Sequence, residues 1–172
     1  MKEGEYLNTI YPLGNQFNAI DSGNVLLIGG GCGVAPLLYL ARDFKEKGLS
    51  PTILIGTRSK KDILLHDEYK KYGNVFFTTE DDSQGEKGYV TQHSIFKDIV
   101  SQFKKIYTCG PDQMMKAVAK IAKEKGIDCE VSLENTMACG IGACLCCVTE
   151  TIHGNLCTCT DGPIFNTKEL KW

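Results

Sequence analysis

The amino-acid sequence predicts an α/β protein built on a five-stranded, parallel, Rossmann-like sheet, with a small cysteine-rich subdomain at its C-terminal end. Three observations support this fold class. Short apolar runs alternate with segments of helical periodicity, which is typical of βαβ units. Glycines follow several of the apolar runs, where strands of such a sheet turn into helices. Six of the nine cysteines fall within residues 139–159, beyond the last expected strand.

The expected strands are short apolar runs bounded by glycine, proline or polar residues. Their length and continuous apolar character are typical of strands that are buried on both faces of a sheet. The five runs comprise residues 25–28, 52–55, 75–79, 105–109 and 129–133.

Helices are expected between these strands, because apolar residues recur there at helical spacing. Right-handed crossovers then place helices on both faces of the sheet. Ligands of such sheets bind at the carboxyl ends of the strands. The expected helices comprise residues 34–47, a segment that begins at Asp62 and ends before Gly73, residues 90–103 and residues 112–125.

A glycine-rich turn follows the first expected strand. Residues 29–33 read Gly-Gly-Gly-Cys-Gly and lead directly into the expected helix 34–47. Such a turn exposes backbone N–H groups to an anion at the positive end of a helix, and a pyrophosphate is the natural ligand. Val34 stands where a G-x-G-x-x-G motif has its third glycine, so this motif alone is weak. A tight turn needed only for packing is the alternative interpretation.

Two more strand ends carry candidate binding residues. Gly110 and Pro111 follow the fourth expected strand, and Thr57 and Arg58 follow the second. Arg58 is suited to pair with a ribose or phosphate group, although a solvated surface arginine is an equally ordinary interpretation.

The cysteine-rich segment has a spacing that points to iron. Four residues separate Cys139 from Cys144, and two separate Cys144 from Cys147. This C-x4-C-x2-C…C pattern is the plant-type ligand arrangement of a [2Fe–2S] cluster. A loop around a cluster must bring its backbone close to the sulfurs, and Gly140 and Gly142 permit this because glycine accepts positive φ.

The fourth thiolate is either Cys157 or Cys159, since both follow a turn at residues 153–155 that returns the chain towards the loop. Cys146 lies next to a ligand and is expected to be a small packing residue. A zinc loop and unligated buried cysteines are the alternatives, but zinc sites more often have paired C-x2-C knuckles.

Charge and composition exclude several classes of protein. The net charge of −2 gives no electrostatic reason to bind nucleic acid or an anionic membrane. The apolar runs are far shorter than a membrane span, and residues 1–14 lack the apolar region of a secretory signal. Nine cysteines without such a signal fit a reducing cytoplasm and a metal or redox centre. We expect a lead-in segment at 1–21, a dinucleotide-binding domain at 22–133 and a cluster subdomain at 134–172.

Several motifs together resemble a known family. Residues 30–37, 56–58, 79–90 and 108–115 are similar to the nicotinamide-binding half of ferredoxin reductase-like flavoproteins. The cysteine tail, above all Cys159-Thr-Asp-Gly-Pro-Ile-Phe at 159–165, resembles the electron transfer subunit of class 1B dihydroorotate dehydrogenase, that is, dihydroorotate dehydrogenase B (NAD+). In that family the last cluster cysteine precedes an acidic-Gly-Pro segment, and this favours Cys159 over Cys157.

The resemblance implies an electron conduit for pyrimidine biosynthesis. Dihydroorotate is oxidised on an FMN-containing partner subunit, and electrons pass through the [2Fe–2S] cluster and FAD to NAD+. The resemblance assigns no catalytic residue, because the cofactors carry the chemistry. It places Gly30, Gly31, Gly33 and Pro36 at the nucleotide turn, and it places Cys109, Gly110 and Pro111 close to the nicotinamide.

The family also has an N-terminal barrel that binds FAD through an Arg-x-Tyr-Ser/Thr motif. Neither Arg42 nor Arg58 is followed by this pattern, and residues 11–17 resemble the hinge that ends the barrel. We therefore expect a C-terminal part of such a subunit, inactive without the FAD domain and the partner.

Other interpretations stay open. The architecture also resembles small subunits of NADPH-dependent ferredoxin or sulfide oxidoreductases and of soluble hydrogenases, and a zinc-stabilised interaction module is the alternative outside enzymes. The residues do not distinguish NAD from NADP, because Arg58, Lys60 and Lys61 could meet a 2′-phosphate; the family resemblance favours NAD. The three histidines, His66, His93 and His153, are expected at surface or capping positions.

Overall fold

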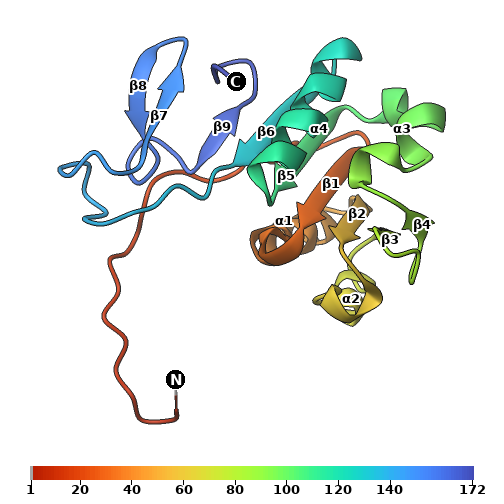
Figure 1. The fold of residues 1–172 in the computed structure, drawn as a ribbon, viewed down its shortest axis with the longest axis horizontal. Helices are drawn as coiled ribbons and strands as arrows, with labels where there is room; N and C mark the ends of the chain where they lie inside the picture. The colour runs from red at the N-terminus through yellow and green to blue at the C-terminus, as the bar shows by residue number, and fades with distance from the viewer. Residues whose placement is uncertain (1) are drawn as a thin grey trace.

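The computed structural model describes residues 2–172 and confirms an α/β fold with a mostly parallel sheet (Figure 1). The sheet has seven strands in the order β4-β3-β2-β1-β5-β6-β9. The strands are β1 (Val25–Gly30), β2 (Thr52–Thr57), β3 (Asn74–Thr79), β4 (Glu86–Lys87), β5 (Lys105–Cys109), β6 (Asp128–Ser132) and β9 (Ile164–Asn166).

All five expected strands are present and pair in parallel, in the order β3-β2-β1-β5-β6. Two strands were not expected. The short β4 pairs with the end of β3 in parallel, and β9 pairs with β6 antiparallel. Because the chain leaves β1 towards β2 and later returns to β5 on the other side of β1, the sheet has its topological switch point between β1 and β5.

Two of the expected helices are confirmed as long helices and two are wrong. The long helices are α1 (Val34–Glu46) and α4 (Asp112–Glu124). The other two segments contain only the single turns α2 (His66–Tyr69) and α3 (Ile95–Asp98), with short 3-10 turns beside them.

Local side-chain bonds and backbone geometry explain the broken helices. Before α2, Leu65 adopts a left-handed conformation with φ of 57°, which no continuous α-helix allows. Before α3, the Nδ1 atom of His93 accepts the N–H of Ile95 at 3.0 Å, and Glu86 accepts the N–H of Ser94 at 2.8 Å. These bonds satisfy backbone donors outside a helix and so compete with helix formation. His93 is only 5% exposed, so a surface position is wrong for this residue, whereas its bond from the N–H of Ile95, the first residue of α3, is the capping contact that was the other expectation.

Helices cover both faces of the sheet, as Figure 1 shows, with α1 and α2 on one face and α3 and α4 on the other. Alternate residues of β1 supply the two cores: Leu27 packs in the cluster that contains α1, and Leu26 packs in the cluster that contains α4. The buried hydroxyl of Tyr69 donates to the carbonyl of Val34 and ties α2 to the start of α1. The fully buried strands are thus the apolar runs of the sequence.

The C-terminal region forms a separate hairpin beside the β6 and β9 edge (Figure 1). Its strands are β7 (Val148–Thr151) and β8 (Gly154–Cys157), joined by the expected turn. The segment before β1 has no helix or strand in its described part, residues 2–24, and passes this region on its way to the sheet. None of the helices within residues 2–172 has the length and apolar character needed to cross a bilayer.

Candidate functional site

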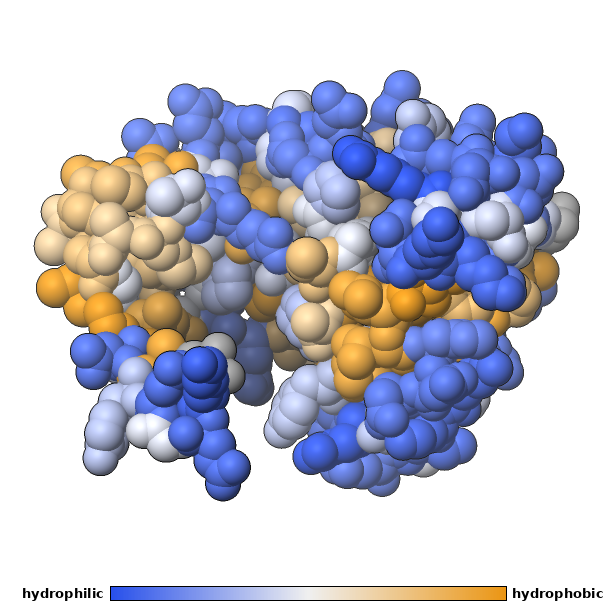
Figure 2. All heavy atoms as spheres, turned by 60° about the horizontal axis from the view of Figure 1, so that its bottom comes forward, coloured by the Kyte–Doolittle hydropathy of each residue, from blue (hydrophilic) through white to orange (hydrophobic). Residues whose placement is uncertain are grey.

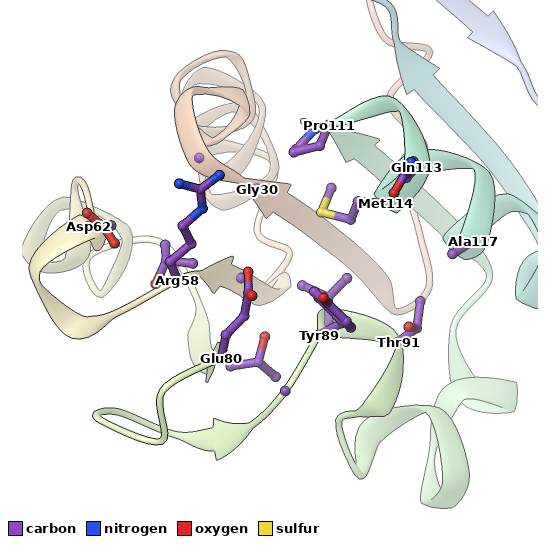
Figure 3. Close-up of a pocket in the computed structure, with 16 residues that line it drawn as sticks. Gly30, Arg58, Asp62, Glu80, Tyr89, Thr91, Pro111, Gln113, Met114 and Ala117 are labelled. Carbon is purple, nitrogen blue, oxygen red and sulfur yellow. The ribbon is translucent and has the colours of Figure 1, made fainter.

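A cavity of about 700 Å³ opens at the carboxyl ends of β1, β2 and β3, next to the start of α4 (Figure 3). This is the edge at which parallel sheets bind their ligands. Its walls are provided by the ends of the strands, by the 88–91 segment and by the first turns of α4. The lining residues are Gly30, Gly31, Gly56, Thr57, Arg58, Asp62, Thr78, Glu80, Gly88, Tyr89, Val90, Thr91, Pro111, Gln113, Met114 and Ala117.

The turn between β1 and α1 is built for close backbone approach. A Cβ atom on Gly33 would lie 2.4 Å from the carbonyl oxygen of Cys109, so only glycine fits where the turn crosses the end of β5. Gly31 has a φ of +54° and open space in front of it. Helix α1 begins without a side-chain cap and without acidic residues in its first turn. Its first N–H groups are therefore suited to an anion.

Charged side chains lie on the opposite wall of the cavity. Figure 3 shows Arg58 extending from the end of β2 towards Gly30, and Glu80 at the end of β3. The carboxylate of Asp62 accepts bonds from the backbone N–H and the hydroxyl of Ser59, at 3.1 and 3.0 Å. Asp62 therefore fixes the loop that presents Arg58, and the arginine is placed to meet an anionic ligand.

The structure brings most of the predicted nucleotide residues to this cavity. Its lining includes the predicted residues Gly30, Gly31, Thr57, Arg58 and Pro111.

The other predicted residues lie behind the wall or elsewhere. Gly33 and Gly110 are buried at the contact between β1 and β5. Cys109 is fully buried behind the cavity wall, and burial raises the pKa of its thiol to about 11, which favours the neutral thiol. Pro36 lines a second hollow of about 720 Å³, between α1 and the lead-in segment.

Sequence reasoning missed several lining residues. Met114 packs against two core clusters as an apolar residue of α4, and its sulfur also reaches Gly30, where a Cβ atom would lie 2.6 Å from it. Gly56 gave a usable signal, because it ends an apolar run as Gly29 and Gly30 do. A Cβ atom there would lie 2.4 Å from Val90, which brings the 88–91 segment over the end of β2.

The cysteine loop folds around the sulfur of Cys139. This sulfur accepts the backbone N–H groups of Ile141 and Cys144, both at 3.4 Å. Gly140 and Gly142 have φ values of +69° and +74°, which aim these N–H groups inwards. N–H···S bonds of this kind surround cluster sulfurs in iron–sulfur proteins and tune their potential.

The second contact joins the loop to the returning chain. The sulfur of Cys147 accepts the backbone N–H of Cys159 at 3.4 Å, and both residues are only 2% exposed. The pKa of the Cys147 thiol is lowered, and the hydrogen bond from the backbone N–H of Cys159 is the largest cause. The N–H of Cys146 and then the side chain of Cys139 lower the pKa of Cys144 to about 6. Donors that favour the thiolate prepare both residues to ligate a metal.

Bonds from backbone N–H groups to sulfurs thus link the four cysteines in two pairs, Cys139 with Cys144 and Cys147 with Cys159. Within residues 2–172, no group of three His, Cys, Asp or Glu side chains is arranged to hold a metal ion. A zinc ion needs four ligands around one centre, whereas a [2Fe–2S] cluster needs two ligands on each of two irons. The linkage of four free cysteines in two pairs agrees with the ligand arrangement of a [2Fe–2S] cluster.

Cys157 and Cys146 lie close to these pairs without the same contacts. The backbone N–H of Cys157 donates to the carboxylate of Asp161 at 2.8 Å. Desolvation, followed by the charge of Cys147, raises the pKa of the Cys157 thiol. Cys146 is exposed on the loop, so the expected buried packing role is wrong for this residue.

Apolar side chains gather around the cysteine loop. Ile141 and Leu145 are 68% and 62% exposed, and Ile10 of the lead-in segment lies against Gly140. Figure 2 shows this apolar area at the left of the molecule, over the loop.

Comparisons with known proteins agree with both halves of the site. A family model described as an oxidoreductase NAD-binding domain matches residues 27–120. A second, described as the iron-sulfur cluster binding domain of dihydroorotate dehydrogenase B, matches residues 134–171. The two matches together identify an NAD-binding part and an iron–sulfur cluster-binding part of the chain.

Among solved structures, an NADH-dependent reduced ferredoxin-NADP oxidoreductase is 34% identical, with a TM-score of 0.89 over the whole chain and 63% of that protein. A C-terminal domain of a hydrogenase from Pyrococcus furiosus, 18% identical with a TM-score of 0.56 over 72% of the chain and 100% of that domain, shares the fold alone.

Curated relatives are named dihydroorotate dehydrogenase B (NAD(+)), electron transfer subunit. The protein from Caldanaerobacter subterraneus subsp. tengcongensis is 38% identical over 99% of this chain and 68% of its own length. A protein from Methanocaldococcus jannaschii, named as a probable member, is also 38% identical, over 100% of this chain and 66% of its own length. The chain thus spans about two thirds of these relatives, and it belongs to the dihydroorotate dehydrogenase B (NAD+) electron transfer subunit family.

Proposed function

We propose that this chain carries the dinucleotide and iron–sulfur parts of an electron transfer subunit that links dihydroorotate oxidation on a partner subunit to NAD+. The observation that supports this most is the presence, in one chain, of a cavity at the carboxyl ends of a parallel sheet and of four free cysteines that backbone N–H···S bonds link in two pairs. The proposed division is a lead-in segment at 1–21, a dinucleotide domain at 22–133 and a cluster subdomain at 134–172.

In the proposed cluster site, Cys139 and Cys144 hold one iron, and Cys147 and Cys159 hold the other. When bound, a [2Fe–2S] cluster supplies one-electron transfer. The protein's part is to present four thiolates and to surround them with backbone donors. The N–H groups of Ile141 and Cys144 stabilise negative charge on the sulfur of Cys139, and the N–H of Cys159 does so for Cys147.

In the proposed dinucleotide site, the turn at Gly30 and Gly31 and the start of α1 bind the pyrophosphate through backbone N–H groups. Arg58 pairs with a phosphate or ribose oxygen from the opposite wall. Pro111 and Met114 form an apolar surface at the end of the cavity next to β5, which orients a nicotinamide ring and excludes water from one face of it.

The proposed partner is an FMN-containing dihydroorotate dehydrogenase subunit, and FAD completes the route between cluster and NAD+. The apolar area around the cysteine loop supports contact with another protein close to the thiols, because such patches mark interaction sites. Nine free cysteines support a reducing, cytoplasmic location.

Anaerobic reconstitution with ferrous iron and sulfide tests the cluster. We expect about two irons and two sulfides per chain, visible absorbance and an electron paramagnetic resonance (EPR) signal after one-electron reduction. A colourless chain that takes up zinc instead would contradict the proposal. Addition of FAD, NAD+, the catalytic subunit and dihydroorotate to the protein tests the route, with formation of NADH as the measurement.

A second candidate is an NADPH-linked ferredoxin oxidoreductase subunit. The 34% identity to an NADH-dependent reduced ferredoxin-NADP oxidoreductase favours it as the alternative. The two functions differ in the electron donor. Reduction of the cluster by ferredoxin, with no response to dihydroorotate and its dehydrogenase subunit, would select the alternative.

A further inference from the structure

The lead-in segment contacts the chain that returns to the cysteine loop. The side-chain amide of Asn15 donates to the carbonyls of Asp161 and Ile164, both at 2.8 Å, and its carbonyl accepts the N–H of Ile164 at 2.9 Å. The backbone N–H of Asn15 also donates to the carbonyl of Gly162 at 2.5 Å. One asparagine therefore holds both ends of the segment 161–164.

The backbones of the lead-in segment and of the segment 161–164 approach so closely that position 14 must be glycine. Gly14 has a φ of +56°, and a Cβ atom there would lie 1.8 Å from the carbonyl oxygen of Gly162. Only glycine allows the two backbones to approach this far. On the other side, the N–H of Leu133 donates to the carbonyl of Pro163 at 2.9 Å, so the segment 161–164 is bound from two directions.

The same segment positions the last two cysteines. The carboxylate of Asp161 accepts the N–H of Cys157 at 2.8 Å, and the N–H of Thr158 donates to the carbonyl of Cys147 at 3.1 Å. The N–H of Cys159 donates to the sulfur of Cys147. A shift of Asp161 therefore moves the turn that carries Cys159 and the N–H bond to the sulfur of Cys147.

The lead-in segment is itself anchored to the sheet. The carbonyl of Asn18 accepts bonds from Lys105 at 3.1 Å and from the hydroxyl of Tyr107 at 2.9 Å, and its N–H donates to Glu130 at 2.9 Å. Phe17 packs edge-on against the Tyr107 ring, with the centroids 5.6 Å apart. Asn15 is thus held by a rigid support three residues away.

We propose that Asn15 is a positioning residue for the cluster: anchored through Asn18 to the sheet, it fixes the turn that carries Cys159 and so sets the environment of the iron held by Cys147 and Cys159. This inference rests on the proposed cluster site. Asn15 touches no ligand sulfur, and it acts by holding the backbone of residues 161–164.

The test compares Asn15→Ala and Asn15→Asp with Asn8→Ala in the reconstituted chain. Asn15→Asp keeps the size and the bond from Ile164, but it places a carboxylate against the carbonyls of Asp161 and Ile164. Asn8 is exposed in the same lead-in segment and serves as the control. The measurements are iron content, EPR of the reduced cluster, midpoint potential and the rate of iron removal by a chelator.

We expect both Asn15 variants to bind NADH as the unaltered chain does, to show a changed EPR spectrum and potential, and to lose iron about tenfold faster. Asn8→Ala should match the unaltered chain. Asn15 variants with the unaltered spectrum, potential and chelator rate would overturn the inference alone. An unaltered chain that forms no cluster would instead overturn the proposed function, and this inference with it. If Asn15→Ala does not fold, the spectrum, potential and chelator rate of Asn15→Asp test the inference.

Discussion

The Nζ atom of Lys105 lies 2.7 Å from Oε1 of Glu130, and both side chains are almost completely buried. The same nitrogen lies 3.3 Å from the carboxylate of Asp128. Asn18 forms a further hydrogen bond to each side chain of the pair: its carbonyl accepts a bond from Lys105, and its N–H donates to Glu130. A buried ion pair whose other donors and acceptors are satisfied can offset its own desolvation. This pair connects β5, β6 and the lead-in segment.

Lys105→Met should destabilise the fold by about 3–5 kcal/mol, because it leaves the charge of Glu130 buried without its partner. The measurement is the free energy of unfolding from urea titration. Lys104→Met is the control, since Lys104 is the exposed neighbour, and it should change stability by no more than about 0.5 kcal/mol. Equal losses in the two variants would show that the ion pair does not stabilise the fold.

Cys159→Ser should abolish the cluster, whereas Cys157→Ser and Cys146→Ser should retain it. Cys159 pairs with Cys147 in the protein interior, while the N–H of Cys157 is bound by Asp161 and Cys146 is exposed. Iron and sulfide content, with the visible spectrum, measures the outcome after identical reconstitution. Loss of the cluster in Cys157→Ser, with retention in Cys159→Ser, would reassign the fourth ligand.

Arg58→Ala should weaken NADH binding by about 10- to 150-fold, because a hydrogen bond from a charged donor to an anion contributes about 1.5–3 kcal/mol. Titration calorimetry with NADH and NADPH measures the change. The chain has one other arginine, Arg42, which pairs with Glu46 on α1 at 3.1 Å and is absent from the cavity lining.

Arg42→Ala is therefore the matched control for charge and should bind both dinucleotides normally. If NADPH binding falls far more than NADH binding in Arg58→Ala, the arginine faces a 2′-phosphate. An unchanged affinity for both would remove Arg58 from the proposed site.

Gly33→Ala should both destabilise the protein, by about 1–3 kcal/mol, and weaken dinucleotide binding. The added methyl group would meet the backbone of Cys109 and Gly110 at 2.4–2.5 Å, so the β1–α1 turn must shift. Gly126→Asn is the control, because Gly126 has a positive φ in open space and asparagine tolerates that conformation. Thermal unfolding and NADH titration measure both effects, and equal behaviour of the two variants would contradict the packing argument.

The sequence was sufficient for the parts of the fold that depend on continuous apolar runs. Residues 25–28 and 105–109 were expected as buried strands, and both lie in the centre of the sheet. It was insufficient for β9, because three residues cannot show a periodicity and this strand exists only by pairing with β6. It also failed at residues 90–103, where helical spacing was present but the bonds of His93 and Ser94 stop the helix.

The candidate site also contains residues that the sequence could indicate and residues that it could not. The cysteine spacing indicated ligands because a loop around a cluster has a fixed number of residues. Glycines after strands indicated the turn at Gly30 and Gly31. Glu80 and Met114 reach the cavity only through the arrangement of β3 and α4 around β1, and no local pattern encodes that arrangement. The link from Asn15 to Ile164 spans nearly the whole chain and is equally invisible in the sequence.

The last prediction concerns pH. His93 is buried, and desolvation lowers the pKa of its imidazole, although the nearby carboxylate of Glu86 opposes this. In the unfolded chain its pKa is about 6.5. As the pH falls below about 6.5, the unfolded state binds a proton at His93 before the folded state does. The stabilisation that His93 contributes is therefore complete above this pH. It is lost as the pH falls from there towards the lowered pKa of His93 in the folded state.

His93→Asn should therefore reduce the fall in melting temperature between about pH 7.5 and 5.5, because an amide does not titrate there. The asparagine oxygen can replace Nδ1 as the acceptor for the N–H of Ile95. His153→Asn is the control, since His153 is exposed and its loss should leave the pH dependence unchanged. Carboxylates other than Glu86, which lies next to His93, contribute equally to all three proteins, so only the difference in slope is informative. Identical slopes for His93→Asn and the unaltered chain would show that His93 is not held neutral by its burial.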